Sequence, residues 1–290
     1  MANKSVSFNT KIYLAALLGL SSLAAVAQTA TAPSPAPKGE IIGSAWVHTA
    51  ESLLASAQQA DVVLPAKATG GAIFKGKLKD IPKLSGGKVP VVVFMHGSSG
   101  LALKAIGEWQ QWLAGLGYAS VAPDSFSLPN RVTYKSPIDV DSYESVHALR
   151  GSEIAPTVQA LKSQTWVDAS QLILAGTSEG SVPVAQYTGT EFMARMMYAW
   201  SCEPNYFVKA PKNAFEAGKP VLNIISATDP FFSKSNSWIG NTNPAGHCGA
   251  ALKGNAMASV LLIPDAPHTV LGLPAARQAT AGFLAQISKP

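Results

Sequence analysis

The sequence predicts an α/β protein with a mostly parallel central sheet and helices on both faces. Short apolar runs rich in β-branched residues, such as Pro90–Met95, are typical of strands buried on both faces. These runs alternate along the chain with segments whose apolar residues have helical spacing. Strands and helices that alternate in this way fold as a parallel sheet wrapped on both sides.

The individual elements follow from the same patterns. After the strand at Pro90–Met95 we expect a helix from about Leu101 to Leu116, which Gly117 ends. Further strands are expected at Tyr118–Ala122, Leu172–Ala175, Arg195–Trp200, Val221–Ser226 and Val260–Ile263. Further helices are expected at Ser142–Gln164, kinked or divided by Pro156, at Ser181–Tyr187 and at Ala275–Ile287. Residues Val47–Phe74 are expected to form a short helix and then a strand at the sheet edge.

Residues 1–27 have the features of a secretory signal peptide. Lys4 and Lys11 precede the apolar run Ile12–Leu20, and Ala25–Ala27 is an A-x-A cleavage pattern. A membrane anchor is the alternative, but this run is shorter than the roughly 20 residues that cross a bilayer. We therefore expect an exported protein, periplasmic or secreted, with no membrane span after the signal is removed.

The rest of the chain divides into a leader and one domain. Residues 28–38 are rich in Ala, Thr, Ser and Pro, so they are expected to form a flexible leader. Residues 39–290 have the length of a single α/β domain. The net charge of +5 falls to +3 without residues 1–27, which hold two lysines and no acid. Because no dense Lys/Arg run occurs, we expect no nucleic-acid partner, and no Cys/His spacing indicates a metal.

The stretch Gly176–Gly180, with the sequence G-T-S-E-G, is the strongest functional signal. It follows an apolar strand and precedes a helix, which is the context in which G-x-S-x-G exposes a nucleophilic serine on a strained turn. Ser178 is therefore the candidate nucleophile. The alternative is an ordinary turn serine in a glycine-rich corner.

A base and an acid follow in the order that this nucleophile needs. Asp229 comes after the strand Val221–Ser226, and His268 comes after the strand Val260–Ile263. The order Ser, Asp, His is that of α/β-hydrolases, so the α/β-hydrolase fold is predicted. Histidine takes the serine proton, and a buried carboxylate orients the imidazole. Asp265 and Glu203 are alternative acids, and an exposed loop histidine is the alternative for His268.

Two backbone amides are expected to bind the oxyanion of such a reaction. Glu179 provides one by its position after the nucleophile. The second is expected from the H-G-S-S-G loop His96–Gly100, where Ser98 is the candidate and Ser99 its rival. The side chain of Glu179 has no part in this, and it either hydrogen-bonds locally or faces solvent.

The remaining candidates concern the loops around the site. Cys202 and Cys248 are the only cysteines, and an exported protein meets an oxidising compartment, so a disulfide is expected, with two buried thiols as the alternative. The candidates for an apolar substrate pocket are Trp109, Phe126, Tyr206, Phe231, Phe232 and Trp238, of which Phe231 and Phe232 stand out because they come directly after Asp229. A place in the core is the alternative for each of these aromatic residues.

With these residues placed, the chain resembles the dienelactone hydrolase family from about Val89 to Ile287. The resemblance is carried by a set of motifs and single residues: the H-G-S-S-G loop, Pro123–Phe126 with Arg131 after it, G-T-S-E-G, Cys202, Asp229 and Pro267-His268. It implies a small hydrolase with a Ser or Cys nucleophile that acts on esters or lactones and needs no cofactor. The dienelactone-opening members use cysteine, whereas Ser178 stands here, which is more like a general esterase.

The expected function is an exported serine hydrolase that cleaves a small-molecule carboxylic ester or lactone through an acyl-enzyme. A peptidase or acyltransferase of the same fold is the alternative within enzymes, and a catalytically silent, ligand-binding pseudo-hydrolase is the alternative outside them. Arg131 is a candidate to pair with a substrate carboxylate, because its guanidinium is a planar two-pronged donor. Its structural alternative is to tie down its own loop.

Overall fold

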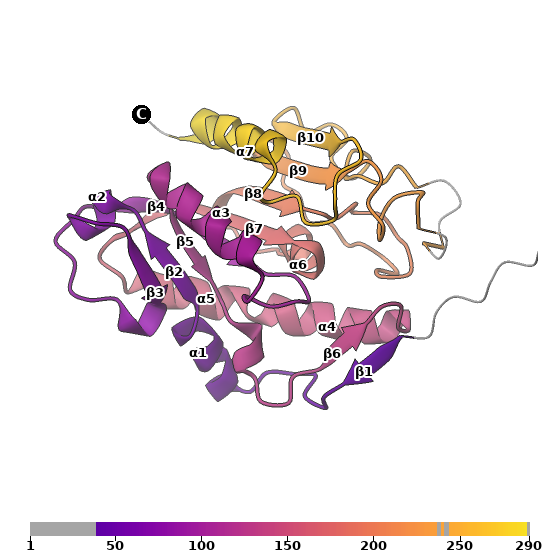
Figure 1. Ribbon diagram of the computed structural model, residues 1–290, viewed down its shortest axis with the longest axis horizontal. Coiled ribbons are helices and arrows are strands. Elements are labelled where there is room, and N and C mark those ends of the chain that lie inside the picture. Colours follow the sequence, from indigo (N-terminus) through magenta and orange to yellow (C-terminus); the bar gives the residue numbers. More distant parts are fainter. Residues whose placement is uncertain (1–38, 237–238, 241–243, 289–290) are drawn as a thin grey trace, which may run out of the picture. The chain divides into compact units, whose positions relative to one another are not determined.

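A computed structural model of the chain describes residues 39–236, 239–240 and 244–288 (Figure 1). Contacts within the chain group Met1–Pro35 separately from Ala36–Pro290, and the fold given below is that of the second unit. The signal peptide expected at residues 1–27 and the leader expected at residues 28–38 lie outside the described residues.

An eight-stranded, mostly parallel sheet forms the centre of the domain. In spatial order its strands are β10 (Ala258–Ile263), β9 (Val221–Ser226), β8 (Phe192–Tyr198), β7 (Val167–Thr177), β4 (Val89–Met95), β5 (Ala119–Ala122), β2 (Asp61–Leu64) and β3 (Phe74–Lys77). Every neighbouring pair is parallel except those of β2, which runs antiparallel to β5 and to β3. The predicted fold class is confirmed.

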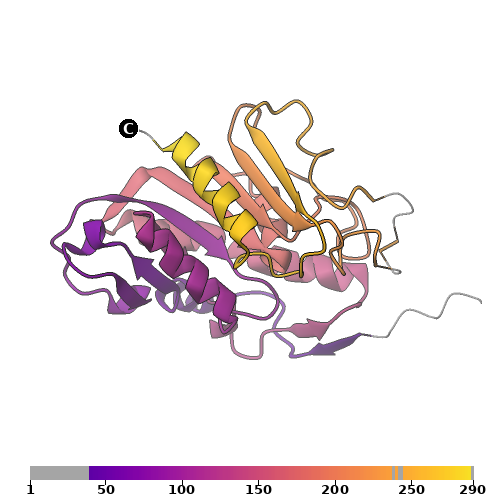
Figure 2. The same cartoon turned by 45° about the horizontal axis from the view of Figure 1, so that its top comes forward.

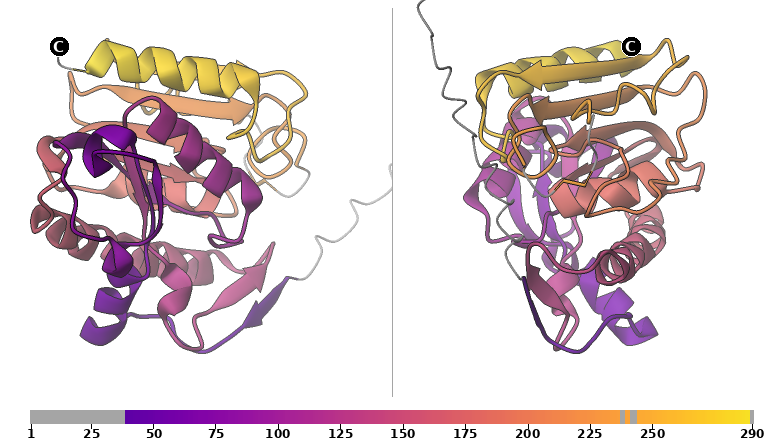
Figure 3. Two further views of the ribbon diagram at one scale, coloured as in Figure 1. Left: turned by 60° about the vertical axis from the view of Figure 1, so that its left-hand side comes forward. Right: turned by 90° about the vertical axis from the view of Figure 1, so that its right-hand side faces the viewer.

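Helices cover both faces of this sheet. One face carries α3 (Lys104–Gly115) and α7 (Pro274–Ile287), which lie in front of the strands in Figure 2. The other face carries α4 (Val140–Ser152), α5 (Ile154–Lys162) and α6 (Ser181–Gln186), and α1 (Ala50–Gln58) packs against α5 (Figure 3).

Strand β7 shows how the sequence produces this arrangement. Ile173 and Ala175 belong to the core under α3 and α7, whereas Leu172 and Leu174 belong to the core on the opposite face. Successive side chains of a strand point to opposite faces, so a continuous apolar run buries both.

The helical segment predicted around Pro156 is divided rather than continuous. α4 ends at Ser152 and α5 begins at Ile154. Proline has no N–H to donate to the carbonyl of Ser152 four residues before it, and it is tolerated in the first turn of a helix. The chain therefore starts a new helix just before the proline.

In the N-terminal part of the domain, the predicted short helix is confirmed as α1, but the strand after it is not at the sheet edge. β2 lies inside the sheet, and the edge beyond it is β3, whose polar sequence FKGK has no apolar alternation. β1 (Glu40–Ile42) and β6 (Thr133–Lys135) pair as a separate antiparallel sheet that was not predicted. Elements this short have no periodicity to read, as is also true of α2 (Ala66–Thr69), η1 (Leu78–Asp80) and η2 (Ser125–Ser127).

Candidate active site

Strand β7 turns sharply into α6 at the G-T-S-E-G stretch. Ser178 opens the one-turn 3-10 helix η3 (Ser178–Gly180) with φ of +52°, a strained value for a residue with a side chain. A Cβ on Gly176 would collide with the carbonyl of Gly180, and one on Gly180 would collide with the carbonyl of Met95. The two glycines are therefore required by close backbone approach.

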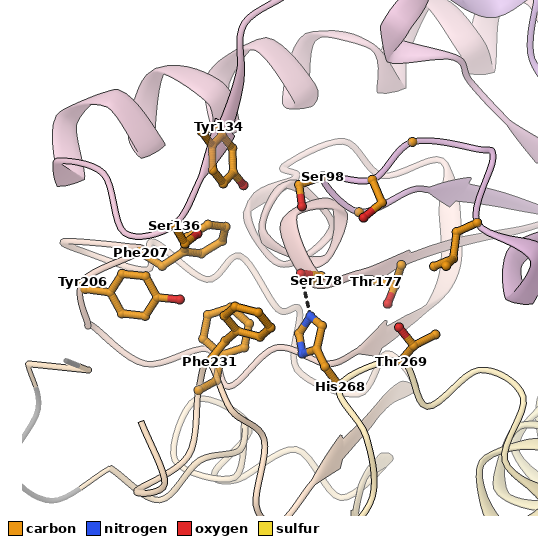
Figure 4. A pocket seen from close by; sticks show the side chains of 15 residues that line it. Ser98, Tyr134, Ser136, Thr177, Ser178, Tyr206, Phe207, Phe231, His268 and Thr269 are labelled. Carbon is orange, nitrogen blue, oxygen red and sulfur yellow. Dashed lines mark hydrogen bonds between the residues drawn. The ribbon is translucent and has the colours of Figure 1, made fainter. Parts of the chain in front are cut away.

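Ser178, His268 and Asp229 form one hydrogen-bonded chain, of which Figure 4 shows the contact between Ser178 and His268. The Oγ of Ser178 lies 2.9 Å from Nε2 of His268, and Nδ1 of His268 lies 2.8 Å from Oδ2 of Asp229. With the imidazole neutral, the Nδ1–H donates to the carboxylate, which leaves Nε2 free to accept from the serine hydroxyl. The imidazole is thus oriented to take a proton from Ser178.

The parallel sheet explains why residues so distant in the chain meet here. Ser178 follows β7, Asp229 follows β9 and His268 follows β10, so each leaves the carboxyl end of a parallel strand. Such ends lie along one edge of the sheet. Asp229 is fully buried, and its Oδ1 accepts the N–H groups of Phe231 and Phe232, which holds the carboxylate in place.

Neither rival acid approaches His268 in this arrangement. The carboxylate of Glu203 accepts the backbone N–H groups of Ala245 and Gly246, and Asp265 is an exposed residue at the end of the β10 turn. Although Asp265 is only three residues from His268 in the sequence, the carboxylate that contacts the imidazole is that of Asp229.

The H-G-S-S-G loop lies beside the nucleophile, and His96 organises it. Nδ1 of His96 donates to the carbonyl of Gly97 at 2.7 Å, and Nε2 accepts from the N–H of Ser125 at 3.3 Å. Burial, with Arg150 nearby, lowers the pKa of His96 to about 3, so the ring is neutral. The amide of Ser98 shares a planar peptide with the Gly97 carbonyl and points the opposite way from it.

The side chain of Glu179 is buried in an ionic network beneath the nucleophile. Its Oε1 accepts from Arg131 and from Arg150, each at 2.9 Å, and its Oε2 accepts from the hydroxyl of Tyr134 at 2.7 Å. Burial alone would raise the pKa of Glu179, but the two guanidinium groups and the hydroxyl outweigh it and hold the pKa at about 2. Of the two expectations for this side chain, local hydrogen bonding is the one observed.

Arg150 extends the network to a second carboxylate. Its Nε donates to Glu153 at 3.1 Å, and its Nη1 donates to the carbonyl of His96 at 2.9 Å as well as to Glu179. Glu153 in turn contacts Nε2 of His48 at 3.1 Å. One guanidinium therefore links the loop of His96 to the turn of Ser178.

The proposed substrate contact of Arg131 does not fit the structure. Besides Glu179, the guanidinium donates to Oγ of Ser125 and to the carbonyl of Val132, each at 2.7 Å. The side chain is only 2% exposed, and Arg131 does not line the pocket. Its nitrogens are all engaged within the protein, so the structural alternative replaces the substrate contact.

A pocket of about 320 Å³ opens in front of Ser178 and His268. One side, which we call the aromatic wall, consists of Tyr134, Tyr206, Phe207, Phe231 and Phe232 (Figure 4). The other lining residues include hydroxyl side chains, namely Ser98, Ser99, Ser136, Thr177 and Thr269. Tyr206, Phe231 and Phe232 thus line the pocket, as the sequence predicted. Trp109 is a core residue and Phe126 is not part of the lining, whereas Trp238 lies outside the described residues.

The sequence analysis missed several residues of this site. Tyr134 lies on the three-residue strand β6, which is too short to show a pattern. Arg150 and Glu153 are charged residues at the end of α4, and charges on a helix are typical of a solvated face. Phe207 was not singled out at all. Their roles depend on contacts with distant segments, for which the sequence held no local signal.

Cys202 and Cys248 form the predicted disulfide, with their Cα atoms 4.8 Å apart. The bond closes a loop that contains Asp229, and the N–H of Cys248 donates to the side chain of the buried Asn223 on β9. The alternative of two unpaired thiols is therefore excluded, and the loop of the acid is fastened to the sheet.

Within the described part of the chain, no group of His, Cys, Asp or Glu side chains could hold a metal ion. A search of the same residues found no helix of the length and hydropathy that crossing a membrane requires.

Comparison with known proteins supports the fold. No protein-family model and no curated protein matches the chain. TT1662 from Thermus thermophilus is similar with a TM-score of 0.51 and 15% identity, over 70% of this chain and 91% of that chain. A dienelactone hydrolase-like promiscuous phosphotriesterase from metagenomic libraries has a TM-score of 0.50 and 19% identity, over 70% of this chain and 88% of that chain.

A PEG-bound, cold-adapted esterase from an Arctic intertidal metagenomic library is similar to the same degree. Its TM-score is 0.50 at 14% identity, over 71% of this chain and 85% of that chain. Together with the sheet topology, these similarities establish the α/β-hydrolase fold for this chain, and at such identities they establish the fold alone.

Proposed function

We propose that this protein is a serine hydrolase that cleaves a carboxylic ester or lactone through an acyl-enzyme. The observation that carries the proposal is the His268 imidazole, which lies within hydrogen-bond distance of both Ser178 and Asp229. Esterase and dienelactone hydrolase-like enzymes occur among the structures that share the fold. We further propose that the chain belongs to the dienelactone hydrolase family, on the motifs given above.

In the first half of the reaction, His268 accepts the hydroxyl proton while Oγ of Ser178 bonds to the carbonyl carbon. The carbonyl electron pair moves to oxygen, where the N–H groups of Glu179 and of Ser98, or of its rival Ser99, stabilise the charge by about 3 kcal/mol each. The C–O bond to the alcohol then breaks, and His268 gives its proton to that oxygen.

In the second half, water takes the place of the alcohol. His268 removes a proton from the water as its oxygen attacks the acyl-enzyme, and then returns the proton to Oγ of Ser178. The acid leaves and the enzyme is restored. Every proton passes through Nε2 of His268, which is why the Nδ1–H contact with buried Asp229 matters for the rate.

Labelling with a fluorophosphonate and turnover of p-nitrophenyl acetate test this proposal. Wild type is expected to be labelled at Ser178 and to turn over the ester, whereas Ser178→Ala loses both. Asp229→Asn is expected to lower kcat by about 10⁴-fold because the imidazole then adopts the wrong tautomer. A folded wild-type protein that neither reacts nor turns over would instead be the silent pseudo-hydrolase. Faster cleavage of a peptide anilide than of the ester would indicate a peptidase.

We also propose that the mature protein is exported. The predicted signal peptide supports this, and the disulfide between Cys202 and Cys248 fits an oxidising compartment. Sequencing the N-terminus of the protein recovered outside the cytoplasm is expected to give Gln28 as the first residue. Recovery of only full-length protein from the cytoplasm would contradict export.

A further inference from the structure

The aromatic wall begins at the catalytic imidazole and extends away from it. The ring of Phe231 meets His268 edge to face, with centroids 4.6 Å apart and an interplanar angle of 65°. Behind it, Phe232 lies 5.4 Å from Phe207 and 6.4 Å from Tyr206, with which it is stacked. A flat group attached near a scissile ester would therefore lie against rings, at the spacing that aromatic pairs prefer.

The lining of the pocket offers no charge to a substrate. Among the described residues that line it there is no Lys, Arg, Asp or Glu, and His268 is the one titratable nitrogen base. A substrate carboxylate would find no cation in this lining.

The cations beneath the pocket are not available either. Arg131 and Arg150 donate to Glu179, and Arg150 also donates to Glu153, so their charges are matched by two carboxylates. Their side chains are 2% and 0% exposed. An anion in the pocket would have to be desolvated without a partner, which is costly.

The Tyr134 hydroxyl offers no hydrogen to an anion in the pocket. Its hydroxyl hydrogen is given to Oε2 of Glu179, so the phenol oxygen presents lone pairs rather than a donor to the pocket. Burial and the neighbouring Glu179 raise the pKa of Tyr134 well above its usual value, and burial also raises that of Tyr206. Both phenols are neutral, and neither Glu179, which Arg131 and Arg150 pair, nor the phenols supply a positive charge to the pocket.

On these grounds, and resting on the proposed ester hydrolysis, we propose that the substrate is an uncharged ester bearing a single aromatic ring, and that esters bearing a carboxylate are excluded. The pocket volume of about 320 Å³ lies at the lower end of the usual range of about 300–1,000 Å³ for ligand sites, which fits one ring with a short chain.

Two series of esters test this specificity, with each kcat/KM divided by the rate constant for hydroxide-catalysed hydrolysis of the same ester, so that differences in intrinsic reactivity cancel. In the acyl series, methyl phenylacetate is compared with methyl cyclohexylacetate and with methyl (4-carboxyphenyl)acetate. In the alcohol series, benzyl acetate is compared with cyclohexylmethyl acetate and with 4-carboxybenzyl acetate. In each series the carboxylate-bearing ester is called the carboxylate twin of the neutral aromatic ester. In at least one series, kcat/KM for the neutral aromatic ester is expected to exceed that of its carboxylate twin by about 100-fold or more. It is expected to exceed that of the cyclohexyl ester by about 3–10-fold.

Failure of this inference is distinguishable from failure of the proposed function. If Ser178-dependent turnover of p-nitrophenyl acetate is present but the carboxylate twins are cleaved as fast as the neutral esters, the exclusion is wrong. Equal cleavage of the phenyl and cyclohexyl esters, or cleavage of no member of either series, overturns the aromatic preference. Absence of both labelling and turnover of p-nitrophenyl acetate overturns the hydrolase itself.

A charge placed in the pocket provides a second test. Ser136 lines the pocket beside Tyr134, and its Oγ accepts from the hydroxyl of Tyr143. Ser136→Lys introduces a cation there, and Ser136→Met is the uncharged control of similar length. The lysine variant is expected to raise kcat/KM for the carboxylate twins at least about 10-fold over the methionine variant. Equal rates in the two variants would show that missing charge is not what excludes anions.

Discussion

Arg150 is the residue whose removal should cost the most stability, because it serves two buried carboxylates. Its guanidinium lies 3.1 Å from Glu153 and 2.9 Å from Glu179, and all three side chains are 0% exposed. Arg150→Met keeps most of the apolar stem and removes the charge. Glu179 retains Arg131 and Tyr134, whereas Glu153 retains no guanidinium and is left with the side chains of His48 and Ser125. Breaking a buried ion pair typically costs about 3–5 kcal/mol, which is the loss expected here.

Urea unfolding followed by tryptophan fluorescence measures this loss, and its pH dependence identifies the cause. In wild type, burial on its own would raise the pKa of Glu153, but Arg150 together with His48, His96 and Ser125 outweighs burial and lowers that pKa. Without Arg150, burial raises that pKa above its unfolded value. Stability from a raised pKa is present below the unfolded value and is lost as pH rises, so the penalty should be larger at about pH 8 than at about pH 5.

The double variant Arg150→Met/Glu153→Gln is the matched control. It removes one carboxylate together with the cation, so its loss of unfolding free energy should be smaller than the sum of the two single losses. A loss below about 1 kcal/mol for Arg150→Met, equal at both pH values, would refute the reasoning, since that is the size of a solvent-exposed pair.

Three further perturbations test other parts of the fold. Replacing Cys202 and Cys248 by Ala is expected to lower the unfolding free energy by about 4 kcal/mol, for a sequence separation of 46 residues, and an unchanged urea midpoint would argue against this. Gly180→Ala should abolish esterase turnover because its Cβ would collide with the carbonyl of Met95. The control Gly282→Ala on α7, where the added Cβ meets open space, should keep full turnover. Equal turnover in the two variants would contradict the close backbone approach at Gly180. Burial lowers the pKa of His147 to about 4, so between about pH 6 and 4 the unfolded chain binds a proton that the folded chain does not. The free energy of unfolding should therefore fall by about 1.4 kcal/mol for each pH unit in this range. His147→Phe should remove that share of the slope, and an identical slope would count against the assignment.

Much of the fold and the chain order of the site could be predicted from the sequence because their signals are local. An apolar run such as Val89–Met95 identifies a strand by its own composition, and Gly176 and Gly180 mark the turn of Ser178 by their spacing. Asp229 and His268 could be placed because each follows such a strand, and parallel strands bring their carboxyl ends to one edge.

Only the tertiary structure decided which side chains from distant parts of the chain contact each other. From the sequence, Arg131 suited a structural role in its own loop somewhat better than a substrate contact, and the structure pairs it with Glu179, a residue 48 positions later. Tyr134 and Phe207 come from segments with no shared pattern, and the folded chain sets them on one wall. The physical reason is range: strand and turn preferences act between near neighbours, whereas the partner of a buried charge or ring is whichever group the completed packing brings within a few ångströms.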